Sequence, residues 1–324
     1  MSLHQPTRWW VRLLDTTDVE LSRLPDPALG AFHFRCRGAP PGMYGTGLES
    51  LTPAAELWRA HGRLRGGQVG AARYLADDDF LFAELHLNEA DCGGLRRTAR
   101  DAYQRLVEYT ESSGYPHLLK VWTHFSAINA GVGDEERYKQ FCVGRAQGIG
   151  ERWRLQEPAA TVIGRKENDP RLSLFWLASV RRGEAIDNPR QTPPRLYPRQ
   201  YGPEPPRFSR AMLLRGFQGD ALLISGTAAV VGAASQHVGN LKLQFAETCQ
   251  NLDVLLAEGA LRLGAAPVWG AGTVLRVYVR EESDLLEAEA LVRQRFPREV
   301  QAVILCGDVC RRELLVEIEA TQQW

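Results

Sequence analysis

A proline-rich stretch near the middle of the chain limits how this sequence can fold. Seven prolines, at positions 189, 193, 194, 198, 203, 205 and 206, fall within the twenty residues from Asp187 to Pro206. Proline lacks a backbone N–H and has a fixed φ, so neither a helix interior nor a central strand can run through such a segment. We therefore predict a connector here, between an N-terminal domain of residues 1–190 and a C-terminal domain of residues 191–324.

The composition is typical of a globular protein that has no strongly charged partner. The 324 residues include 39 Lys and Arg against 39 Asp and Glu, and 44% are hydrophobic. Zero net charge argues against a nucleic-acid partner and against a membrane-surface role. No window of about 18 uncharged apolar residues occurs, and the first residues lack the pattern of a secretory signal. We therefore expect a cytoplasmic protein whose six scattered cysteines are reduced.

The clearest pattern in the N-terminal half is a strand, a helix and a strand over residues 80–125. FLFAELHLN alternates like a strand, apolar residues from Leu95 to Tyr109 recur at helical spacing, Gly114 ends the helix, and HLLKVWTHF follows as a strand. Such a crossover joins parallel or near-neighbour strands of one sheet. Before residue 76 we predict only short strands, near 31–36 and 69–75.

The C-terminal third repeats this pattern. ALLISGTAAVVG predicts a strand, a tight turn and a strand, and a helix through Phe245 is expected to end at Gly259. TVLRVYVR predicts a strand, residues 284–296 a second helix, and AVILCGDVCRRELLVEIEA a strand, a turn and a final strand. These elements predict an α+β fold.

Two C-terminal strands place their ionisable side chains on one face. Alternation separates an aliphatic face from an ionisable one, which carries Arg276, Tyr278 and Arg280 on one strand and Glu317 and Glu319 on the other. If helices cover the aliphatic faces, the ionisable faces meet either solvent or a polar cleft. In solvent Glu317 is an ordinary surface residue. In a cleft, burial raises its pKa and lets it carry a proton near neutral pH.

Motifs for metal or cofactor chemistry are weak in this sequence. CGDVC offers two thiolates, but the sequence has no second close cysteine pair and no HxxxH element to complete a zinc site. Cys306 and Cys310 are better explained as the flanks of a Gly-Asp turn. HExxH, GxSxG and a complete phosphate or dinucleotide loop are absent. We therefore expect neither a metal nor an organic cofactor.

Four separated blocks of this sequence resemble the chorismatases, enzymes that release pyruvate from chorismate. The blocks are ERYKQFCVGRAQG, DNPRQTPPRLYPRQYGPEPPRFSRA, LLISGTAAVVG with QFAETCQNL, and DVCRRELLVEIEA, and the resemblance spans roughly residues 43–324. The C-terminal part also resembles the broader YjgF/RidA family. The resemblance implies two YjgF/RidA-like α/β units with mixed sheets and helices packed on one face. The N-terminal unit would be degenerate, and the substrate would lie near the junction.

The resemblance also implies site residues. Glu317 falls on the family's catalytic carboxylate and would protonate the methylene carbon of the enolpyruvyl ether. Arg145, Tyr201 and Arg210 lie in the blocks that resemble substrate-binding segments and would hold the two carboxylates of chorismate, since guanidinium binds carboxylate bidentately. The further candidates are Arg276, which shares the polar face of its strand, and Gly226 and Thr227, whose N–H groups and hydroxyl can approach a ligand.

Cys310 bears on the product. It stands seven residues before Glu317, as in family members that form 3-hydroxybenzoate. We therefore expect 3-hydroxybenzoate and pyruvate, with 4-hydroxybenzoate as a candidate by-product. The alternative within the family is hydrolysis to a dihydroxycyclohexadiene carboxylate, with Cys310 only a small apolar residue. Lys120 stands where the family pattern has arginine, so ring selectivity would differ if it touches substrate.

Two other classes of function compete with this interpretation. One is a YjgF/RidA-like imine deaminase or ligand-binding protein, in which Glu317 positions water. The other is a degenerate scaffold without chemistry. The length of the chain favours a chorismatase, because simple YjgF-like proteins are single short domains. Neither pattern nor resemblance decides between a monomer and a homotrimer.

Overall fold

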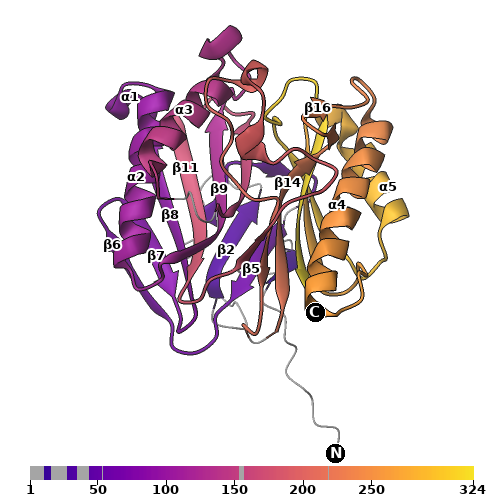
Figure 1. Ribbon diagram of the computed structural model, residues 1–324, viewed down its shortest axis with the longest axis horizontal. Helices are drawn as coiled ribbons and strands as arrows, with labels where there is room; N and C mark the ends of the chain where they lie inside the picture. The colour runs from indigo at the N-terminus through magenta and orange to yellow at the C-terminus, as the bar shows by residue number, and fades with distance from the viewer. Residues whose placement is uncertain (1–10, 16–27, 35–43, 53, 153–156, 218) are drawn as a thin grey trace, which may run out of the picture.

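The computed structural model describes residues 11–15, 28–34, 44–52, 54–152, 157–217 and 219–324. Three larger sheets and a two-stranded hairpin are arranged so that an N-terminal half and a C-terminal half lie side by side (Figure 1). None of the helices within these ranges is long and apolar enough to cross a membrane.

The N-terminal half is built on a six-stranded sheet in the order β10-β9-β11-β8-β7-β6. These strands are β6 (Arg65–Val69), β7 (Ala72–Ala76), β8 (Phe80–Asn88), β9 (His117–Ser126), β10 (Ala159–Arg165) and β11 (Arg171–Ser179). The helices are α1 (Glu89–Cys92), α2 (Leu95–Ser112) and α3 (Arg137–Ile149). As predicted, β8, α2 and β9 form one unit, and β11 pairs antiparallel with both strands, so they are parallel near neighbours.

The C-terminal half is built on a seven-stranded sheet in the order β12-β13-β14-β19-β17-β18-β4. The strands are β4 (Glu49–Ser50), β12 (Glu184–Ile186), β13 (Ala211–Leu214), β14 (Ala221–Ala228), β17 (Thr273–Val279), β18 (Gln301–Cys306) and β19 (Val316–Gln323). The helices are α4 (Leu241–Leu263) and α5 (Leu285–Arg295), and the small hairpin is β15 (Val230–Val231) with β16 (Ala234–Ser235).

The two large sheets repeat one topology. In each, a strand leads through a long helix to a parallel near neighbour, a second helix leads to the next parallel strand, and the last strand inserts between the first two. β8, β9, β10 and β11 correspond in this way to β14, β17, β18 and β19. The predicted α+β architecture of two mixed-sheet units, each with helices on one face, is confirmed. The boundary at residue 190 stays a prediction, although β12 already pairs in the C-terminal sheet.

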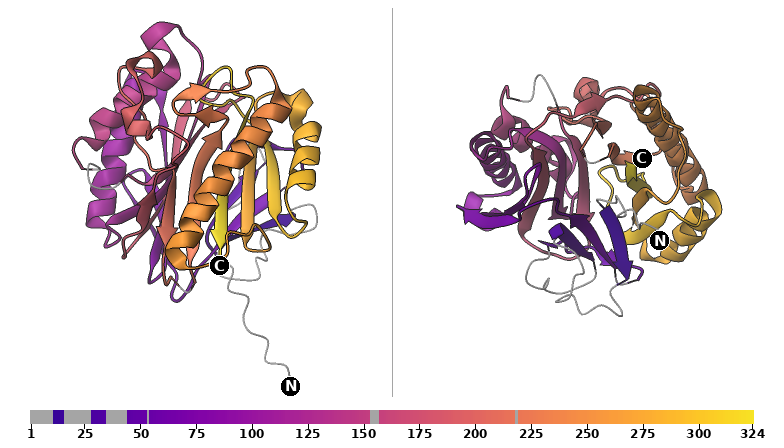
Figure 2. Two further views of the ribbon diagram at one scale, coloured as in Figure 1. Left: turned by 45° about the vertical axis from the view of Figure 1, so that its right-hand side comes forward. Right: turned by 90° about the horizontal axis from the view of Figure 1, so that it is seen from below.

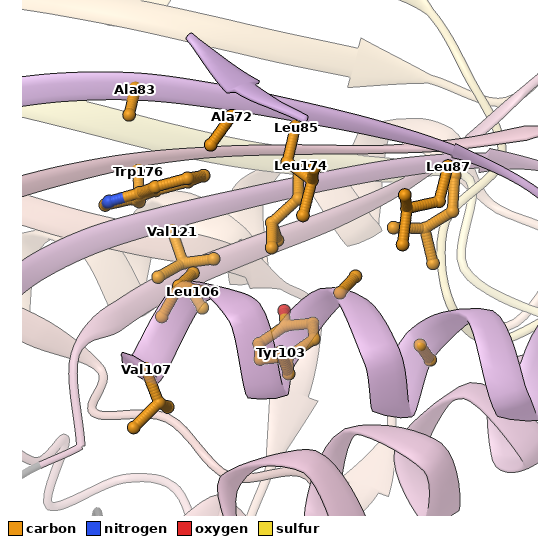
Figure 3. Close-up of a cluster of buried hydrophobic side chains, with 14 of the residues drawn as sticks. Ala72, Ala83, Leu85, Leu87, Tyr103, Leu106, Val107, Val121, Leu174 and Trp176 are labelled. Atoms are coloured by element: carbon orange, nitrogen blue, oxygen red, sulfur yellow. The ribbon is translucent and has the colours of Figure 1, made fainter. Parts of the chain in front are cut away.

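The helices cover the outer faces of the sheets, and the inner faces turn toward each other (Figure 2). The apolar face of α2, including Tyr103 and Leu106, packs on Leu85, Val121 and Trp176 of the N-terminal sheet (Figure 3). Leu275, Val277 and Val279 pack beneath α4 and α5, as alternation predicts. The ionisable faces of β17 and β19 therefore point into the interior between the sheets rather than toward solvent.

A four-stranded sheet in the order β1-β5-β2-β3 closes one side of this interior. Its strands are β1 (Val11–Asp15), β2 (Ala28–Phe34), β3 (Tyr44–Gly45) and β5 (Ala54–Arg59). Phe32, Phe34 and Trp58 join the core shared by both large sheets. Of the predicted strand near 31–36, residues 35 and 36 lie outside the described residues. The prediction near 69–75 was imprecise, because a turn at Gly70 separates β6 from β7.

Two local predictions in the C-terminal half were wrong. The SGT run does not form a turn: Ser225, Gly226 and Thr227 lie inside β14, where the register with β19 shifts between Ile224 and Thr227. Gly259 does not end α4, which continues to Leu263 and is capped by Gly264. At Gly259 a Cβ would come 2.9 Å from Leu222 Cδ2, so this glycine permits close packing of helix on sheet.

Candidate active site

A cavity of about 230 Å³ lies at the seam between the two halves. Its walls come from α3, from β10 and β14, from the proline-rich connector and from the loop between β18 and β19. The connector contains two short 3₁₀ turns, Pro194–Leu196 and Arg199–Tyr201. It does more than join the two halves, because it supplies a wall that includes Gln191, Tyr197, Gln200, Tyr201, Pro206, Phe208 and Arg210.

Glu317 lies in this cavity and is only 5% exposed. Its position follows from β19, which points Val316 and Ile318 into the core beneath the helices and Glu317 the other way. Burial, reinforced by the negative charge of Glu319, raises the pKa of Glu317 to about 8. Within the described part of the chain, the Glu317 carboxyl has no hydrogen-bond partner. With its pKa raised to about 8, Glu317 is a protonated acid near neutral pH, and it lines the cavity.

Arg145 supplies a buried positive charge to the same cavity. It is 1% exposed, and its Nε has no hydrogen-bond partner in the described part of the chain. Its Nη2 lies 3.8 Å from the sulfur of Cys142, and the guanidinium lies 5.2 Å from the centre of the Phe141 ring. No carboxylate among the described residues pairs with it. A buried guanidinium without a counter-ion is costly, so this arrangement favours binding of an anion.

Arg210 supplies a second buried guanidinium from the connector side. It is 4% exposed, and its Nη2 donates to Tyr197 Oη at 2.7 Å and to the carbonyl oxygen of Thr192 at 3.1 Å. No described residue forms a hydrogen bond with its Nε. Tyr201 also lines the cavity, and Arg311 stacks on its ring at 3.9 Å. The structure thus brings Arg145, Arg210 and Tyr201 together with Glu317.

Cys310 lines the cavity from the loop between β18 and β19. Burial, with a further contribution from Glu317, raises the pKa of its thiol to about 12, so the sulfur is a neutral thiol rather than a thiolate. Cys306 ends β18, but the predicted Gly-Asp turn is wrong: Asp308 forms an isolated antiparallel bridge with Gly164, and the turn before β19 lies at Arg312 and Glu313. In the described ranges, no three His, Cys, Asp or Glu side chains gather as a metal site would need.

Gly226 and Thr227 take different positions from those expected. Gly226 lines the cavity, but its N–H donates to Thr161 Oγ1 at 3.0 Å and is not directed at a ligand. Thr227 is fully buried outside the cavity, and its hydroxyl donates to the carbonyl oxygen of Ser225 at 2.8 Å. The extended course of β14 accounts for this, because the N–H of Ser225 donates to the carbonyl oxygen of Arg210 and that of Gly226 to Thr161 rather than to a ligand.

Arg276 also lies outside the cavity. Its guanidinium forms a bidentate pair with Glu56, at 2.6 Å for both contacts, and reaches Glu319 at 3.2 Å. It stacks over Phe32 in the core between the sheets. The expectation that Arg276 binds substrate is not met by this geometry. Alternation identified its face correctly, but the four-stranded sheet supplies Glu56 as an internal partner.

The cavity carries an excess of positive charge. Its five cationic side chains are Lys139, Arg145, Arg210, Arg311 and Arg312, and its three carboxylic side chains are Glu136, Glu313 and Glu317. Burial raises the pKa of Glu136, and Glu317 is the neutral acid described above. Apolar walls from Ala160, Val162, Phe208 and Leu314 complete the site. Such a cavity favours a small, multiply charged anion with an apolar body.

Comparison with known proteins places this chain and its fold in a family. A family model described as chorismatase FkbO/Hyg5-like, N-terminal, matches residues 56–178. A 3-hydroxybenzoate synthase from Streptomyces hygroscopicus is 33% identical over 280 residues, covering 82% of this chain and 81% of that relative. The chain belongs to the chorismatase family. A chorismatase from Streptomyces rapamycinicus is 32% identical over 275 residues, with coverage of 82% and 81%.

A solved chorismatase structure agrees with the whole fold. It matches with a TM-score of 0.83 and 28% sequence identity, over 97% of this chain and 98% of that one. The resemblance to the chorismatases, which was drawn from roughly residues 43–324, is thus confirmed for both halves.

Sequence reasoning missed several cavity residues. Helix α3 was not predicted, although it carries Tyr138 and Lys139 as well as Arg145. Arg311 was overlooked, even though it follows Cys310 directly. Arg311 and Arg312 form a basic pair directly after Cys310, and this pair is the signal that could have identified Arg311. Lys120 does not touch the cavity, because its Nζ pairs with Glu319 at 2.8 Å.

Proposed function

We propose that this protein is a chorismatase that cleaves chorismate to 3-hydroxybenzoate and pyruvate. The observation that carries the proposal is a buried Glu317, with its pKa raised to about 8, in a cavity that also holds two guanidinium groups with no carboxylate partner among the described residues. Membership of the chorismatase family supports it, as does the similarity to a relative named 3-hydroxybenzoate synthase.

Substrate binding would rest on the buried arginines. Chorismate is a dianion, with one carboxylate on the ring and one on the enolpyruvyl group. We assign these carboxylates to Arg145 and Arg210, with Tyr201 and Arg311 closing the connector side. A desolvated guanidinium without a carboxylate partner gains most when a carboxylate arrives, so the pocket selects a substrate with two acidic groups.

Glu317 would act as the general acid. Its proton adds to the methylene carbon of the enol ether, which becomes a methyl group, and positive charge develops on the adjacent ether-bearing carbon. Glu317 is left as a carboxylate that stabilises this charge and later recovers a proton. Breaking of the ether link then releases pyruvate. A carboxyl group ionised at working pH could not begin this sequence, which is why its burial matters.

The ring outcome would depend on Cys310. In the aromatising outcome the bond between the ring and the ether oxygen breaks, and that oxygen leaves as the keto oxygen of pyruvate. The neighbouring hydroxyl oxygen shifts to the vacated ring carbon and a ring proton is lost, so the atoms of chorismate equal those of 3-hydroxybenzoate plus pyruvate. The reaction therefore needs no oxidant and consumes no net water. In the alternative outcome one water molecule is consumed: it adds to the carbon that carries the positive charge, and a dihydroxycyclohexadiene carboxylate forms beside pyruvate. The neutral thiol of Cys310 beside Glu317 supports the aromatising outcome, because it replaces a water site with a weakly polar group.

Incubation of the purified protein with chorismate tests the proposal. Pyruvate is measured with a coupled assay, and the ring product is resolved by chromatography against 3- and 4-hydroxybenzoate and the diol. Equal amounts of pyruvate and 3-hydroxybenzoate are expected. Pyruvate together with the diol would show that the protein hydrolyses chorismate and does not form 3-hydroxybenzoate. Absence of pyruvate would refute chorismate cleavage and favour a YjgF/RidA-like imine deaminase or binding protein.

A further inference from the structure

Two buried glutamate side chains on β19 lie close together and differ in charge: at neutral pH one is protonated and the other is ionised. Glu317 and Glu319 are two residues apart on one strand, so their side chains project from the same face, about 7 Å apart along the chain. They are 5% and 4% exposed. Glu317 opens to the cavity, whereas Glu319 does not line it. Similar burial therefore cannot explain why only one of them is neutral.

Glu319 is surrounded by donors from three strands. Lys120 Nζ and Arg276 Nη1 lie 2.8 and 3.2 Å from its oxygens, and Trp122 Nε1 donates to it at 3.0 Å. Tyr278 donates at 2.6 Å, and Thr161 donates through its hydroxyl. Although burial opposes ionisation, Lys120 and Arg276 lower the pKa of Glu319 to about 2. Glu319 is thus a permanent negative charge beside the acid.

The same cluster is connected to the surroundings of Glu317. Thr161 Oγ1 accepts from the N–H of Gly226, on which the Glu317 carboxyl rests, and donates to Glu319. Lys120 Nζ also donates to the carbonyl oxygen of Ile224 at 2.6 Å, at the irregular part of β14. The charge on Glu319 and the position of Glu317 therefore depend on one set of contacts.

Other ionisable groups lie around Glu317 or line the same cavity. They are Lys120 on β9, Glu136, Tyr138, Lys139 and Arg145 on and before α3, Arg210 before β13, Tyr278 and Arg280 on and after β17, and Cys310, Arg311, Arg312 and Glu313 in the loop before β19. After burial itself, Glu319 contributes most to retention of the Glu317 proton, and Lys120 is the strongest opposing charge.

Building on the proposed acid role of Glu317, we propose that Glu319 and Lys120 are positioning residues that set its protonation state. The negative charge of Glu319 keeps the proton on Glu317 at neutral pH. Lys120 holds Glu319 ionised and limits its effect, so that Glu317 can still give up the proton to substrate. Neither residue touches the cavity, and each acts through Glu317.

The proposal predicts pH shifts of opposite sign in two variants. Glu319→Gln removes the negative charge and leaves the positive charges, so Glu317 ionises at lower pH. The alkaline limb of kcat/KM should move down by about one pH unit or more, which is about tenfold in rate on that limb. Lys120→Met should move the same limb upward. Lys120→Arg keeps the charge and should restore the wild-type profile.

The experiment compares kcat/KM for pyruvate release against pH in the wild type and these three variants. Glu84→Gln is the matched control, because Glu84 is a buried carboxylate on β8 paired with Arg73 and His86, away from the cavity. Its profile should not shift. A lowered kcat with unshifted limbs in both Glu319→Gln and Lys120→Met would show a merely structural role and overturn the proposal.

An infrared titration of the ligand-free protein separates this proposal from the proposed function. The protonated-carboxyl band of Glu317 is assigned by its loss in Glu317→Gln, and its midpoint is followed in each variant. Shifted midpoints without pyruvate release would retain the coupling and refute the function. Pyruvate release with unmoved midpoints would refute the coupling alone. If Glu319→Gln does not fold, the upward shift in Lys120→Met decides, and its absence refutes the proposal.

Discussion

The carboxyl group of Glu317 rests directly on Gly226. A Cβ at residue 226 would overlap Glu317 Oε1 and come 2.9 Å from its Cδ. Gly226 therefore permits the acid to occupy its place in the cavity. Because residue 226 on β14 has no side chain, the carboxyl group of Glu317 on the neighbouring strand β19 has room.

Gly226→Ala should therefore reduce pyruvate release by at least about tenfold, because the added methyl group displaces the Glu317 carboxyl from its productive position. We expect the protein to remain folded, since the displaced group borders a cavity. Circular dichroism and steady-state kinetics check both points. Activity close to that of the wild type would show that catalysis does not depend on the position of the Glu317 carboxyl against residue 226.

The pH dependence of the wild type should follow the ionisation of Glu317. Because the acid form is active and the pKa of Glu317 is raised to about 8, kcat/KM should be level at neutral pH and fall above about pH 8. The measurement is initial-rate pyruvate release in buffers of constant ionic strength. A profile that still rises through pH 9 would contradict a Glu317 proton donor.

Glu317→Gln should lower turnover by at least about 100-fold while chorismate still binds, because the amide keeps the shape but has no acid proton. Binding is measured by calorimetry with the inactive variant. Turnover near the wild-type level would show that Glu317 is not the general acid.

The same substitution should stabilise the protein at alkaline pH. The native state holds the Glu317 proton up to about pH 8, whereas an unfolded carboxyl with the ordinary value of 4.5 releases it, so wild-type stability falls as pH rises between these values. Gln has no such dependence. The difference in melting temperature between Glu317→Gln and wild type should therefore grow from pH 5 to pH 8, and a constant difference would contradict the raised pKa.

Cys310→Ala should divert product from 3-hydroxybenzoate toward the dihydroxycyclohexadiene carboxylate, because a smaller side chain admits water beside Glu317. Chromatography of the ring products measures the ratio. Cys306→Ala is the control, since Cys306 lies outside the cavity at the end of β18. An unchanged product ratio in Cys310→Ala would show that Cys310 does not determine which ring product forms.

Arg145→Met and Arg210→Met should each raise KM for chorismate by about tenfold or more, because each removes a charged partner of one carboxylate. Arg199→Met is the control from the same connector. Arg199 pairs with Asp134 at the surface and does not line the cavity. Unaltered KM in both cavity variants would refute their assignment to the carboxylates.

Local patterns predicted the elements on which the site is built. Alternation in TVLRVYVR and LLVEIEA assigned Arg276, Glu317 and Glu319 to the ionisable faces of their strands, opposite the aliphatic faces, and helical spacing located α2. These predictions succeeded because the facing of a side chain along a strand or helix depends on a period that the sequence itself contains. The resemblance to chorismatases added Arg145, Tyr201 and Arg210, which no periodicity identifies as neighbours.

Which charges meet inside the molecule was decided by tertiary structure. Arg276 shares its face with Glu317 in the sequence pattern, yet Glu56, more than two hundred residues earlier, claims its guanidinium in the core. Lys120 reaches Glu319 in the same way across the seam between the halves. The charge state of a buried group depends on burial and on such distant partners, and strand alternation contains no information about either. The sequence therefore specified a polar face with two glutamates, and only the packing of three sheets made one a protonated acid and the other a permanent negative charge beside it.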